Sequence, residues 1–302
     1  MPREKIIATG PLADIATDIL EEFGDVIIAP DYSENTLIDV IEDAMALVVR
    51  GEGIANARVI EAGKKLRVIG RSGVGYNNID IDAATARKIP VVFTPGAGAR
   101  AVAEGAMAMM LALSKDLIYW DKQLKAGNWE SRFETRTRDL DGATIGIIGF
   151  GRIGQMLATM LQPFQCSLLA HDPYVSTEIT QQFDARLVSL EELFQLSDFI
   201  SVHAVATDES KGLINRELLG QLRQGCFFVN MARGELVESL DILEEAMADG
   251  RLAGVGLDVF APEPPDVSHP IFKRPNCLTS PHALGVSFRA TENIFGSMAR
   301  DM

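Results

Sequence analysis

The first hundred residues alternate between short apolar runs and stretches with helical periodicity. The runs that we predict to be buried strands are Ile6–Ala8, Val26–Ile28, Leu47–Val49, Val68–Ile69 and Val91–Phe93. A helical face between two of them consists of Leu37, Ile38, Ile41 and Met45. This alternation predicts an α/β fold, with a parallel sheet that carries helices on its faces.

A second series of the same kind begins near residue 144 and predicts a second parallel sheet. Its runs are Thr144–Ile148, Leu168–Ala170, Phe199–Val202, Phe227–Val229, Val255–Val259 and Leu278–Ser280. Between the two series, Ala101–Lys125 is rich in Ala, Met and Leu and lacks Pro, which predicts one long helix. We therefore expect two domains, at about residues 1–99 and 100–283.

The composition is that of a globular protein and narrows the range of partners. Of 302 residues, 47% are apolar and 23% are charged, and the net charge is −14. Because nucleic-acid backbones and membrane surfaces are anionic, this charge argues against either as a partner. The N-terminus leads straight into an apolar strand, so no secretory leader is expected. The longest stretch without a charge, Ile153–His171, contains three Gln and a Pro, so no membrane span is expected either.

The cysteines and histidines suggest neither disulfides nor a metal site. Cys166, Cys226 and Cys277 lie far apart in apolar surroundings, without a CxxC motif. Free buried thiols are therefore expected, which favours a reducing, cytoplasmic compartment. No cluster of His, Cys and Asp has the spacing of metal ligands, so no metal is expected.

Residues 149–154 read GFGRIG and match the GxGxxG pattern of dinucleotide-binding turns. The pattern alone is weak, but here it follows a predicted strand and begins an amphipathic helix. Gly149 would permit the tight turn, Gly151 the approach of a pyrophosphate, and Gly154 close packing of the helix. Asp172 lies 18 residues after Gly154, where a carboxylate binds ribose hydroxyls and repels a 2′-phosphate. These features predict NAD as cofactor; the alternative is a glycine turn in another kind of α/β protein.

Three segments at the predicted ends of later strands carry groups that suit carbonyl reduction. Arg233 can hold a substrate carboxylate by a two-pronged contact, and His282 can deliver or remove the proton on the carbinol oxygen. Glu263 can orient the imidazole and stabilise its charged form. Each residue alone has an ordinary explanation, as a helix-start cation, a loop charge or a cap. Their joint occurrence beside a dinucleotide turn favours catalysis.

Two other histidines, His203 and His269, are alternatives for the same role. His203 also ends a predicted strand and is the rival base. Because no carboxylate motif accompanies it, we interpret His203 as a structural residue or a neighbour of the cofactor. His269 lies in a Pro-rich loop and is assigned no role.

Further motifs extend over nearly the whole chain. They are Val49-Arg50, Gly70–Asp80, Thr94–Gly96, Val102–Glu104, Leu140–Gly142, Gly149–Gly154, Met231–Gly234, Leu257–Phe260 and Ser280–His282. Together they resemble the D-isomer-specific 2-hydroxyacid dehydrogenases, and within them the phosphoglycerate-dehydrogenase-like group. Asn77 stands where this family usually has Asp, Val205 where it usually has Pro, and Gly285 later than the Gly of many relatives.

The resemblance implies two Rossmann-like, doubly wound parallel-sheet domains with the active site in a cleft between them. Residues 1–99 with 284–302 would form a discontinuous substrate-binding domain, and residues 100–283 the NAD-binding domain. Family members usually form homodimers through the long helix of the latter domain. The chain would stop at Met302, inside the expected last helix, with no regulatory domain after it.

The resemblance also implies roles for individual residues. Arg233, Glu263 and His282 would be the catalytic arginine, the partner of the histidine and the acid/base. The implied cofactor contacts are Arg152, Ile153, Asp172, Met231, Ala232, Arg233, Asp258, His282 and Gly285. The backbone of Gly73, Val74 and Gly75 would cradle the substrate carboxylate, which Arg233 would also bind.

Arg50 and Arg71 lie 21 residues apart, each at the predicted end of a first-domain strand. If both bind a second anion such as a phosphate, 3-phosphoglycerate is the leading substrate, and relatives of the phosphoglycerate-dehydrogenase group have arginines at matching places. Arg50 could equally be a solvated cation, and reduction of glyoxylate or hydroxypyruvate is the close competitor. An NAD(H)-sensing co-repressor scaffold also stays open, whereas Glu263 argues against formate dehydrogenases, which resemble this chain but carry Gln there.

Overall fold

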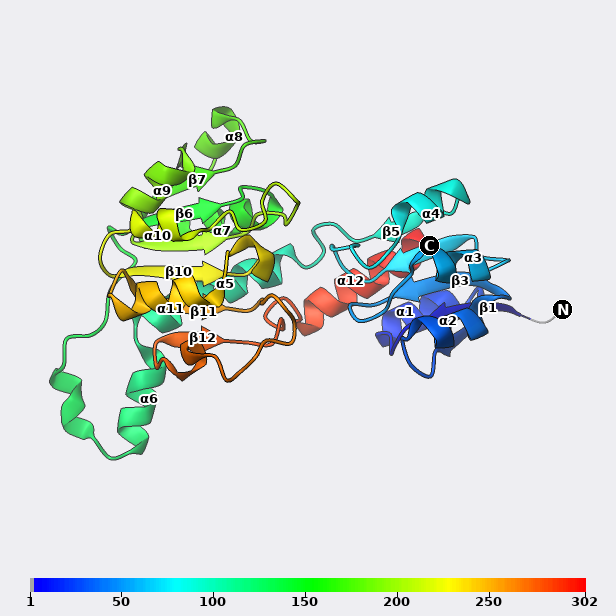
Figure 1. The fold of residues 1–302 in the computed structure, drawn as a ribbon, viewed down its shortest axis with the longest axis horizontal. Helices are drawn as coiled ribbons and strands as arrows, with labels where there is room; N and C mark the ends of the chain where they lie inside the picture. Colours follow the sequence, from blue (N-terminus) through cyan, green and yellow to red (C-terminus); the bar gives the residue numbers. More distant parts are fainter. Residues whose placement is uncertain (1–2) are drawn as a thin grey trace. The chain divides into compact units, whose positions relative to one another are not determined.

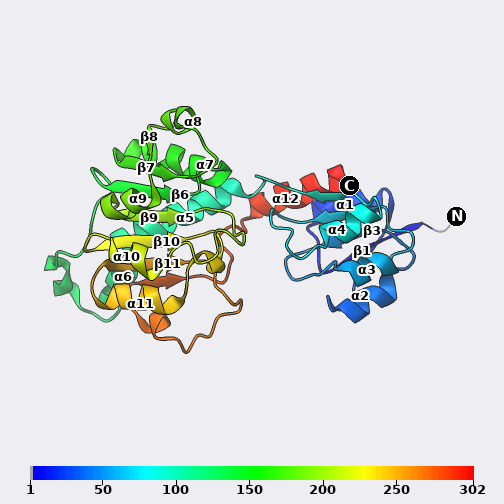
Figure 2. The same ribbon diagram turned by 45° about the horizontal axis from the view of Figure 1, so that its top comes forward.

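The computed structural model describes residues 3–302, which fold into two compact units (Figures 1 and 2). One unit runs as far as Gly98 and resumes at Val286–Met302, and the other is Ala99–Gly285. Each unit contains a parallel β-sheet with helices packed against it. The prediction of two Rossmann-like α/β domains is confirmed.

The first unit is built on a parallel sheet, whose order in the described residues is β2-β1-β3-β4-β5. The strands are β1 (Glu4–Ala8), β2 (Gly24–Ile28), β3 (Ala44–Val49), β4 (Val68–Arg71) and β5 (Val91–Phe93), so each predicted run is a strand. The helices are α1 (Asp14–Glu21), α2 (Glu34–Ile41), α3 (Ala57–Ala62), α4 (Ile81–Ala86) and α12 (Phe288–Asp301). In Figures 1 and 2 the red helix α12 lies beside the blue α1, and its buried Phe295 and Met298 join the core of this unit.

The second unit has a parallel sheet of order β12-β11-β10-β9-β6-β7-β8 in the described residues. Its strands are β6 (Thr144–Ile148), β7 (Ser167–His171), β8 (Ala185–Leu187), β9 (Phe199–Val202), β10 (Cys226–Asn230), β11 (Leu252–Leu257) and β12 (Cys277–Thr279). The α-helices are α5 (Ala99–Ser114), α6 (Leu117–Lys125), α7 (Arg152–Leu161), α8 (Thr177–Gln181), α9 (Leu190–Leu196), α10 (Arg216–Gly220) and α11 (Leu240–Ala248). Short 3₁₀ helices are η1 (Trp129–Phe133), η2 (Gln162–Phe164), η3 (Gly234–Leu236) and η4 (Pro270–Lys273).

The strand order of the second unit reverses between β6 and β9, which are neighbours in the sheet although β7 and β8 lie between them in sequence. Loops that leave the carboxyl ends of such strands diverge and leave room for a ligand. The glycine turn follows β6, and His203 follows β9. The fold therefore places the predicted dinucleotide turn at the reversal point.

The prediction of one long helix over Ala101–Lys125 is wrong. The helix α5 ends at Ser114, and Asp116 adopts a left-handed φ of +47° before α6 begins. The segment that leads back from η1 to β6 stabilises this break, because the backbone N–H of Arg138 donates to the carbonyl oxygen of Ser114 at 2.7 Å. The guanidinium of Arg136 also donates to the carboxylate of Asp116 at 2.7 Å. These contacts come from residues about twenty positions away, so local propensity could not reveal them.

Candidate active site

Each glycine of the turn after β6 occupies a position that favours glycine for a different structural reason. Gly149 has a φ of +88°, and a Cβ there would overlap the backbone of Ala204. A Cβ on Gly154 would overlap the carbonyl oxygen of Gly149, so α7 packs directly on the turn. At Gly151, by contrast, no atom lies within 4 Å of the place of a Cβ. This open space at the N-terminus of α7 fits an incoming pyrophosphate.

Asp172 follows β7 and supports the glycine turn. Its Oδ2 accepts a hydrogen bond from the backbone N–H of Phe150 at 2.8 Å, and its Oδ1 accepts one from Tyr174 at 2.9 Å. The carboxylate is thus fixed beside the turn, at the strand end from which dinucleotide folds bind ribose hydroxyls. The residues present therefore fit NAD, and a negative charge here disfavours a 2′-phosphate.

The substitution Asp172→Asn tests this fit. The amide oxygen can still accept from Phe150, but the charge is lost, so we expect NADH affinity to fall by about tenfold. The preference for NADH over NADPH should shrink by a similar factor of about ten because repulsion of the 2′-phosphate disappears. Titration of cofactor fluorescence measures both affinities. Asp184→Asn, at an exposed carboxylate in the same unit, is the control, and an unchanged preference in D172N would contradict the assignment.

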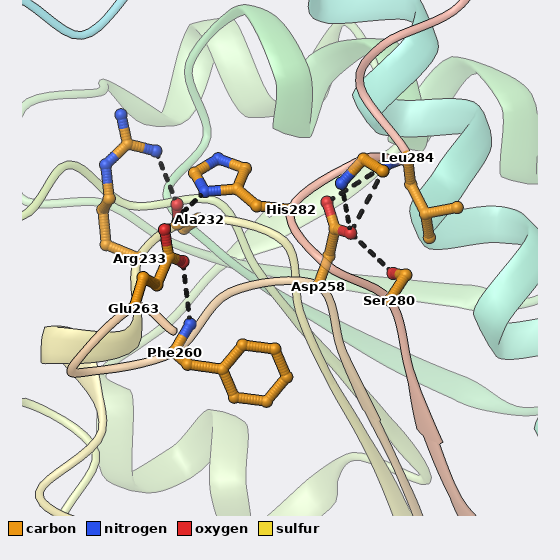
Figure 3. A network of polar contacts seen from close by, with 9 residues as sticks. Ala232, Arg233, Asp258, Phe260, Glu263, Ser280, His282 and Leu284 are labelled. Carbon is orange, nitrogen blue, oxygen red and sulfur yellow. Dashed lines mark hydrogen bonds and ion pairs between the residues drawn. The ribbon is translucent and has the colours of Figure 1, made fainter. Parts of the chain in front are cut away.

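His282 and Glu263 form a hydrogen-bonded pair (Figure 3). The imidazole Nδ1 lies 3.0 Å from Oε2 of Glu263, and Oε1 of Glu263 accepts from the backbone N–H of Phe260 at 3.0 Å. An ionised carboxylate can only accept, so it holds the imidazole with the hydrogen on Nδ1. In residues 3–302 nothing hydrogen-bonds to the other ring nitrogen, Nε2. That nitrogen is available to exchange a proton with a ligand.

Asp258 holds the segment that carries His282. Its side chain is 2% exposed, and Oδ1 accepts from the hydroxyl of Ser280 at 2.5 Å and from the backbone N–H of Ala283 at 2.9 Å. Its carbonyl oxygen accepts from the backbone N–H of His282 at 2.8 Å. His282 itself has a left-handed φ of +53°, which costs free energy unless neighbouring contacts impose it. The hydrogen bonds of Asp258 to residues on both sides of His282 supply those contacts. The predicted contact of Asp258 with NAD stays a prediction.

Arg233 lies in a turn that its neighbour Asn230 shapes. The buried Asn230 accepts from the backbone N–H of Ala232 and donates to the carbonyl oxygen of Arg233, each at 3.0 Å. A Cβ on Gly234 would overlap the backbone of Phe260, so this turn packs tightly against the loop that leads to Glu263. The guanidinium uses Nη1 to donate to the carbonyl oxygen of Ala232 at 2.7 Å, and its other nitrogens have no partner in residues 3–302. Figure 3 shows this hydrogen bond to Ala232 together with the His282–Glu263 pair.

The structure thus brings the turns of Arg233, Glu263 and His282 together at the carboxyl ends of β10, β11 and β12. Sequence reasoning assigned these three residues but gave no role to Asn230 or Ser280. Ser280 begins the motif Ser280–His282, and Asn230 directly precedes the motif Met231–Gly234. The available signal was a short polar side chain at the end of a buried apolar strand.

The remaining residues that are predicted to contact the cofactor lie at the start of α7, in the Arg233 turn and after His282. Arg152 and Ile153 begin α7 after the glycine turn, and Met231 and Ala232 are buried in the Arg233 turn. A Cβ on Gly285 would lie 2.9 Å from the side chain of Val102 on α5, so this glycine allows close packing. Their contacts with NAD stay predictions.

His203 differs from His282 in its surroundings. Its Nε2 lies 2.8 Å from the hydroxyl of Ser201, and its Nδ1 is buried without a partner in residues 3–302. Burial lowers the pKa of His203 to about 4. The imidazole is therefore neutral at pH 7 and has no proton to deliver, which agrees with its interpretation as a structural residue or a neighbour of the cofactor.

This burial makes stability depend on pH. The pKa of His203 is about 4 in the folded chain against 6.5 for an ordinary histidine, so the unfolded chain binds the proton first as the pH falls. Stability from this group is present above pH 6.5 and is lost toward pH 4, by about 2 kcal/mol between pH 7 and pH 5. His203→Gln cannot titrate and should lose less stability over that range. Urea unfolding at both pH values measures the difference, and parallel losses in the two proteins would contradict the prediction.

The predicted substrate residues belong to the first unit. Arg50 follows β3, Arg71 ends β4, and Gly73 has a φ of +137° that only glycine adopts readily. A Cβ on Gly73 would stand 3.0 Å from Nη1 of Arg71, so the guanidinium lies against the Gly73 backbone. The structure therefore places one cation beside the segment Gly73–Gly75.

Two negative observations apply to the described residues. Within residues 3–302, no three His, Cys, Asp or Glu side chains gather as they would around a metal ion. No helix in the same range has the length and apolar character to span a membrane.

Known proteins resemble the chain along almost its entire length. It is 37% identical to a D-3-phosphoglycerate dehydrogenase of Archaeoglobus fulgidus over 99% of this chain and 56% of that protein. It is 35% identical to a hydroxypyruvate reductase of Thermotoga maritima over 93% of this chain and 92% of that protein. The chain spans about half the length of the D-3-phosphoglycerate dehydrogenases that it matches.

A solved structure and a family model agree with these sequence relatives. The crystal structure of D-lactate dehydrogenase from Aquifex aeolicus, complexed with NAD and lactic acid, superposes with a TM-score of 0.87 at 25% identity, over 99% of this chain and 94% of that one. Residues 107–283 match the model of the D-isomer specific 2-hydroxyacid dehydrogenase, NAD binding domain. The chain belongs to the D-isomer-specific 2-hydroxyacid dehydrogenase family, with an NAD-binding domain that carries the glycine turn and the His282–Glu263 pair.

Proposed function

We propose that the protein is an NAD-dependent dehydrogenase that interconverts 2-oxo acids and D-2-hydroxy acids. The observation that carries the proposal is the His282–Glu263 pair, with Nε2 of the imidazole available, on the unit that contains the glycine turn. An acid/base on a dinucleotide-binding unit is what carbonyl reduction requires. Membership of the family supports the same activity.

His282, Glu263 and Arg233 have different roles in the proposed reaction. NADH, when bound, supplies the hydride that forms the new bond to C2 of the 2-oxo acid. Protonated His282 gives the proton from Nε2 to the former carbonyl oxygen, and Glu263 stabilises the imidazolium before the transfer. Arg233 holds the substrate carboxylate with the guanidinium nitrogens that the protein leaves available. In the oxidising direction His282 takes the proton back.

The substrate is proposed to be a 2-hydroxy acid or 2-oxo acid with one or two anionic groups. Arg50 and Arg71 would bind a phosphate, which favours 3-phosphoglycerate, and several relatives are named D-3-phosphoglycerate dehydrogenase. Glyoxylate or hydroxypyruvate is the second candidate, because the hydroxypyruvate reductase of Thermotoga maritima matches the chain over 92% of its own length.

A panel of acids distinguishes these substrates. NADH oxidation is followed by absorbance with phosphohydroxypyruvate, hydroxypyruvate, glyoxylate, pyruvate and branched 2-oxo acids. The highest kcat/KM is expected with phosphohydroxypyruvate, and a higher value with hydroxypyruvate or glyoxylate would favour the second candidate. No turnover on the whole panel would overturn the proposal in favour of an NAD(H)-sensing scaffold.

We also propose that the protein is a homodimer that assembles through its NAD-binding unit. Figure 1 shows α6 and η1 extending away from the sheet of that unit. This arm exposes large apolar side chains, among them Leu117, Leu124, Trp129 and Phe133. Such a patch on a protein surface supports burial against another chain, and the family resemblance favours a second copy.

The arm can be tested directly. The double substitution Trp129→Ser and Phe133→Ser should convert a dimer into a monomer in analytical ultracentrifugation, because it removes two large apolar side chains from the proposed interface. Both residues are more than half exposed, so their replacement should leave the core of the unit intact. Ile27→Ser, at an exposed apolar residue of β2, is the control. Equal masses for the parent and the double variant would contradict the proposed interface.

The expected cytoplasmic compartment is part of the proposal. Cys166, Cys226 and Cys277 are all free thiols, and burial raises the pKa of Cys277 to about 12. Burial also raises the pKa of the Cys226 thiol. Thiols held in this protonated state are poorly reactive, and their lack of pairing supports a reducing compartment.

A further inference from the structure

Two strand-end loops of the first unit meet at a single side chain, Asn78. Its Nδ2 donates to the carbonyl oxygen of Arg50 at 2.8 Å and to that of Gly53 at 2.6 Å. Its Oδ1 accepts from Nε of Arg71 at 3.3 Å. One amide therefore joins the loop after β3 to the guanidinium at the end of β4.

The backbone of Asn78 and the loop after β3 are fixed independently of this amide. The backbone N–H of Ala55 donates to the carbonyl oxygen of Asn78 at 2.8 Å. The buried Thr9, which follows β1, accepts from the backbone N–H of Arg50 at 2.9 Å. A Cβ on Gly53 would overlap the side chain of Thr9, so this loop has no room to shift toward β1. The amide of Asn78 thus links two backbone segments that other contacts already fix.

An amide is the group that fits this position. It presents two N–H donors to two carbonyl oxygens and one oxygen to a guanidinium, within one planar group. A carboxylate of the same shape would satisfy Arg71 but would face the carbonyl oxygens of Arg50 and Gly53 without a donor. An alanine would leave all three partners without this contact.

We propose that Asn78 is a positioning residue that sets the direction of the Arg71 guanidinium for an anionic substrate. The guanidinium of Arg71 lies against the backbone of Gly73, beside the segment predicted to cradle the substrate carboxylate. A displacement of Arg71 therefore changes the binding of the acid, whereas the glycine turn and His282 belong to the other unit. The inference rests on the proposed function, in which Arg71 binds the acid.

The test compares Asn78→Ala and Asn78→Asp with Asn77→Ala, an exposed neighbour without a hydrogen bond from its side chain in the described residues. N78A should raise KM for the best acid of the panel by about 10- to 100-fold, because charged contacts lose their orientation. In N78A the Kd for NADH and kcat should stay within about threefold of the parent's values, because Asn78 does not belong to the unit that carries the glycine turn and His282. N78D, which keeps the acceptor for Arg71, should raise KM less than N78A does.

A second measurement does not depend on turnover. Binding of oxalate or inorganic phosphate to the NADH-loaded chain is followed by calorimetry, and N78A should weaken it by about the same factor as it raises KM. If N78A does not fold, the isosteric N78D carries the test alone, with weaker binding expected than in the parent. If both Asn78 variants match N77A in KM and in anion affinity, the inference is overturned while the proposed function stands. A parent chain that neither reduces an acid nor binds these anions overturns both.

Discussion

Replacing His282 with alanine is expected to lower kcat for 2-oxo acid reduction by about 100- to 10,000-fold, the usual contribution of a general acid. The imidazole is held by Glu263 through Nδ1, so Nε2 alone is placed to give the proton. Alanine removes that donor and leaves only solvent to protonate the developing alkoxide. Stopped-flow measurement of NADH oxidation at saturating acid gives the loss directly.

His269 supplies a matched control for this prediction. It is also a histidine in a loop of the second unit, hydrogen-bonded to a carboxylate, Asp241, at 3.0 Å. His269→Ala should leave kcat within about twofold of the parent because the residue is assigned no role in the reaction. The Kd for NADH should be unchanged in H269A. Equal turnover in H282A and H269A would remove His282 from the mechanism.

Replacing Arg233 with lysine should lower kcat/KM for the acid by about 100-fold although the charge is retained. A guanidinium offers a planar pair of donors that matches a carboxylate, whereas an ammonium is a single point of charge on a flexible stem. The Arg233 turn is fixed by Asn230 and by the close approach of Gly234 to Phe260, so the backbone has little freedom to adapt. Arg216→Lys, at a surface ion pair with Glu245, is the control.

The separate kinetic constants show how Arg233 acts. If it only binds the carboxylate, KM rises and kcat stays near that of the parent; if it also orients the carbonyl carbon, kcat falls as well. We expect both to change, because the acid must be held at a defined distance from the acid/base. A lysine variant with the parent's kcat and KM would show that the two-pronged contact is not made.

The features that could be predicted from sequence are those that a local pattern of residues determines. The dinucleotide turn was predictable because the strand before Gly149, the amphipathic helix after it and Asp172 lie close together in the sequence.

The end of β11 was predicted less well. The predicted run extended to Val259, whereas the strand stops at Leu257. At Asp258 the backbone carbonyl oxygen accepts from the backbone N–H of His282, in the loop after β12, so the pairing between strands ends there.

The unpredicted features depend on contacts between distant segments. The short strand β8 (Ala185–Leu187) lies at the edge of its sheet, where residues 3–302 give it β7 as its single partner. Its three residues are too few to show a period. The hydrogen bonds of Asp258 on both sides of His282 require it to meet residues more than twenty positions away. The amide of Asn78 likewise reaches Arg50 across 28 positions. No local periodicity marks such contacts, so only coordinates show them.

The stereochemistry of the product tests the account most directly. The chain is incubated with hydroxypyruvate and NADH, and the glycerate formed is resolved by chiral chromatography while NADH loss is recorded. We predict D-glycerate, one molecule for each NADH consumed, and almost none when H282A replaces the parent. L-glycerate, or the same yield of D-glycerate from H282A, would contradict reduction at a centre formed by Arg233, Glu263 and His282.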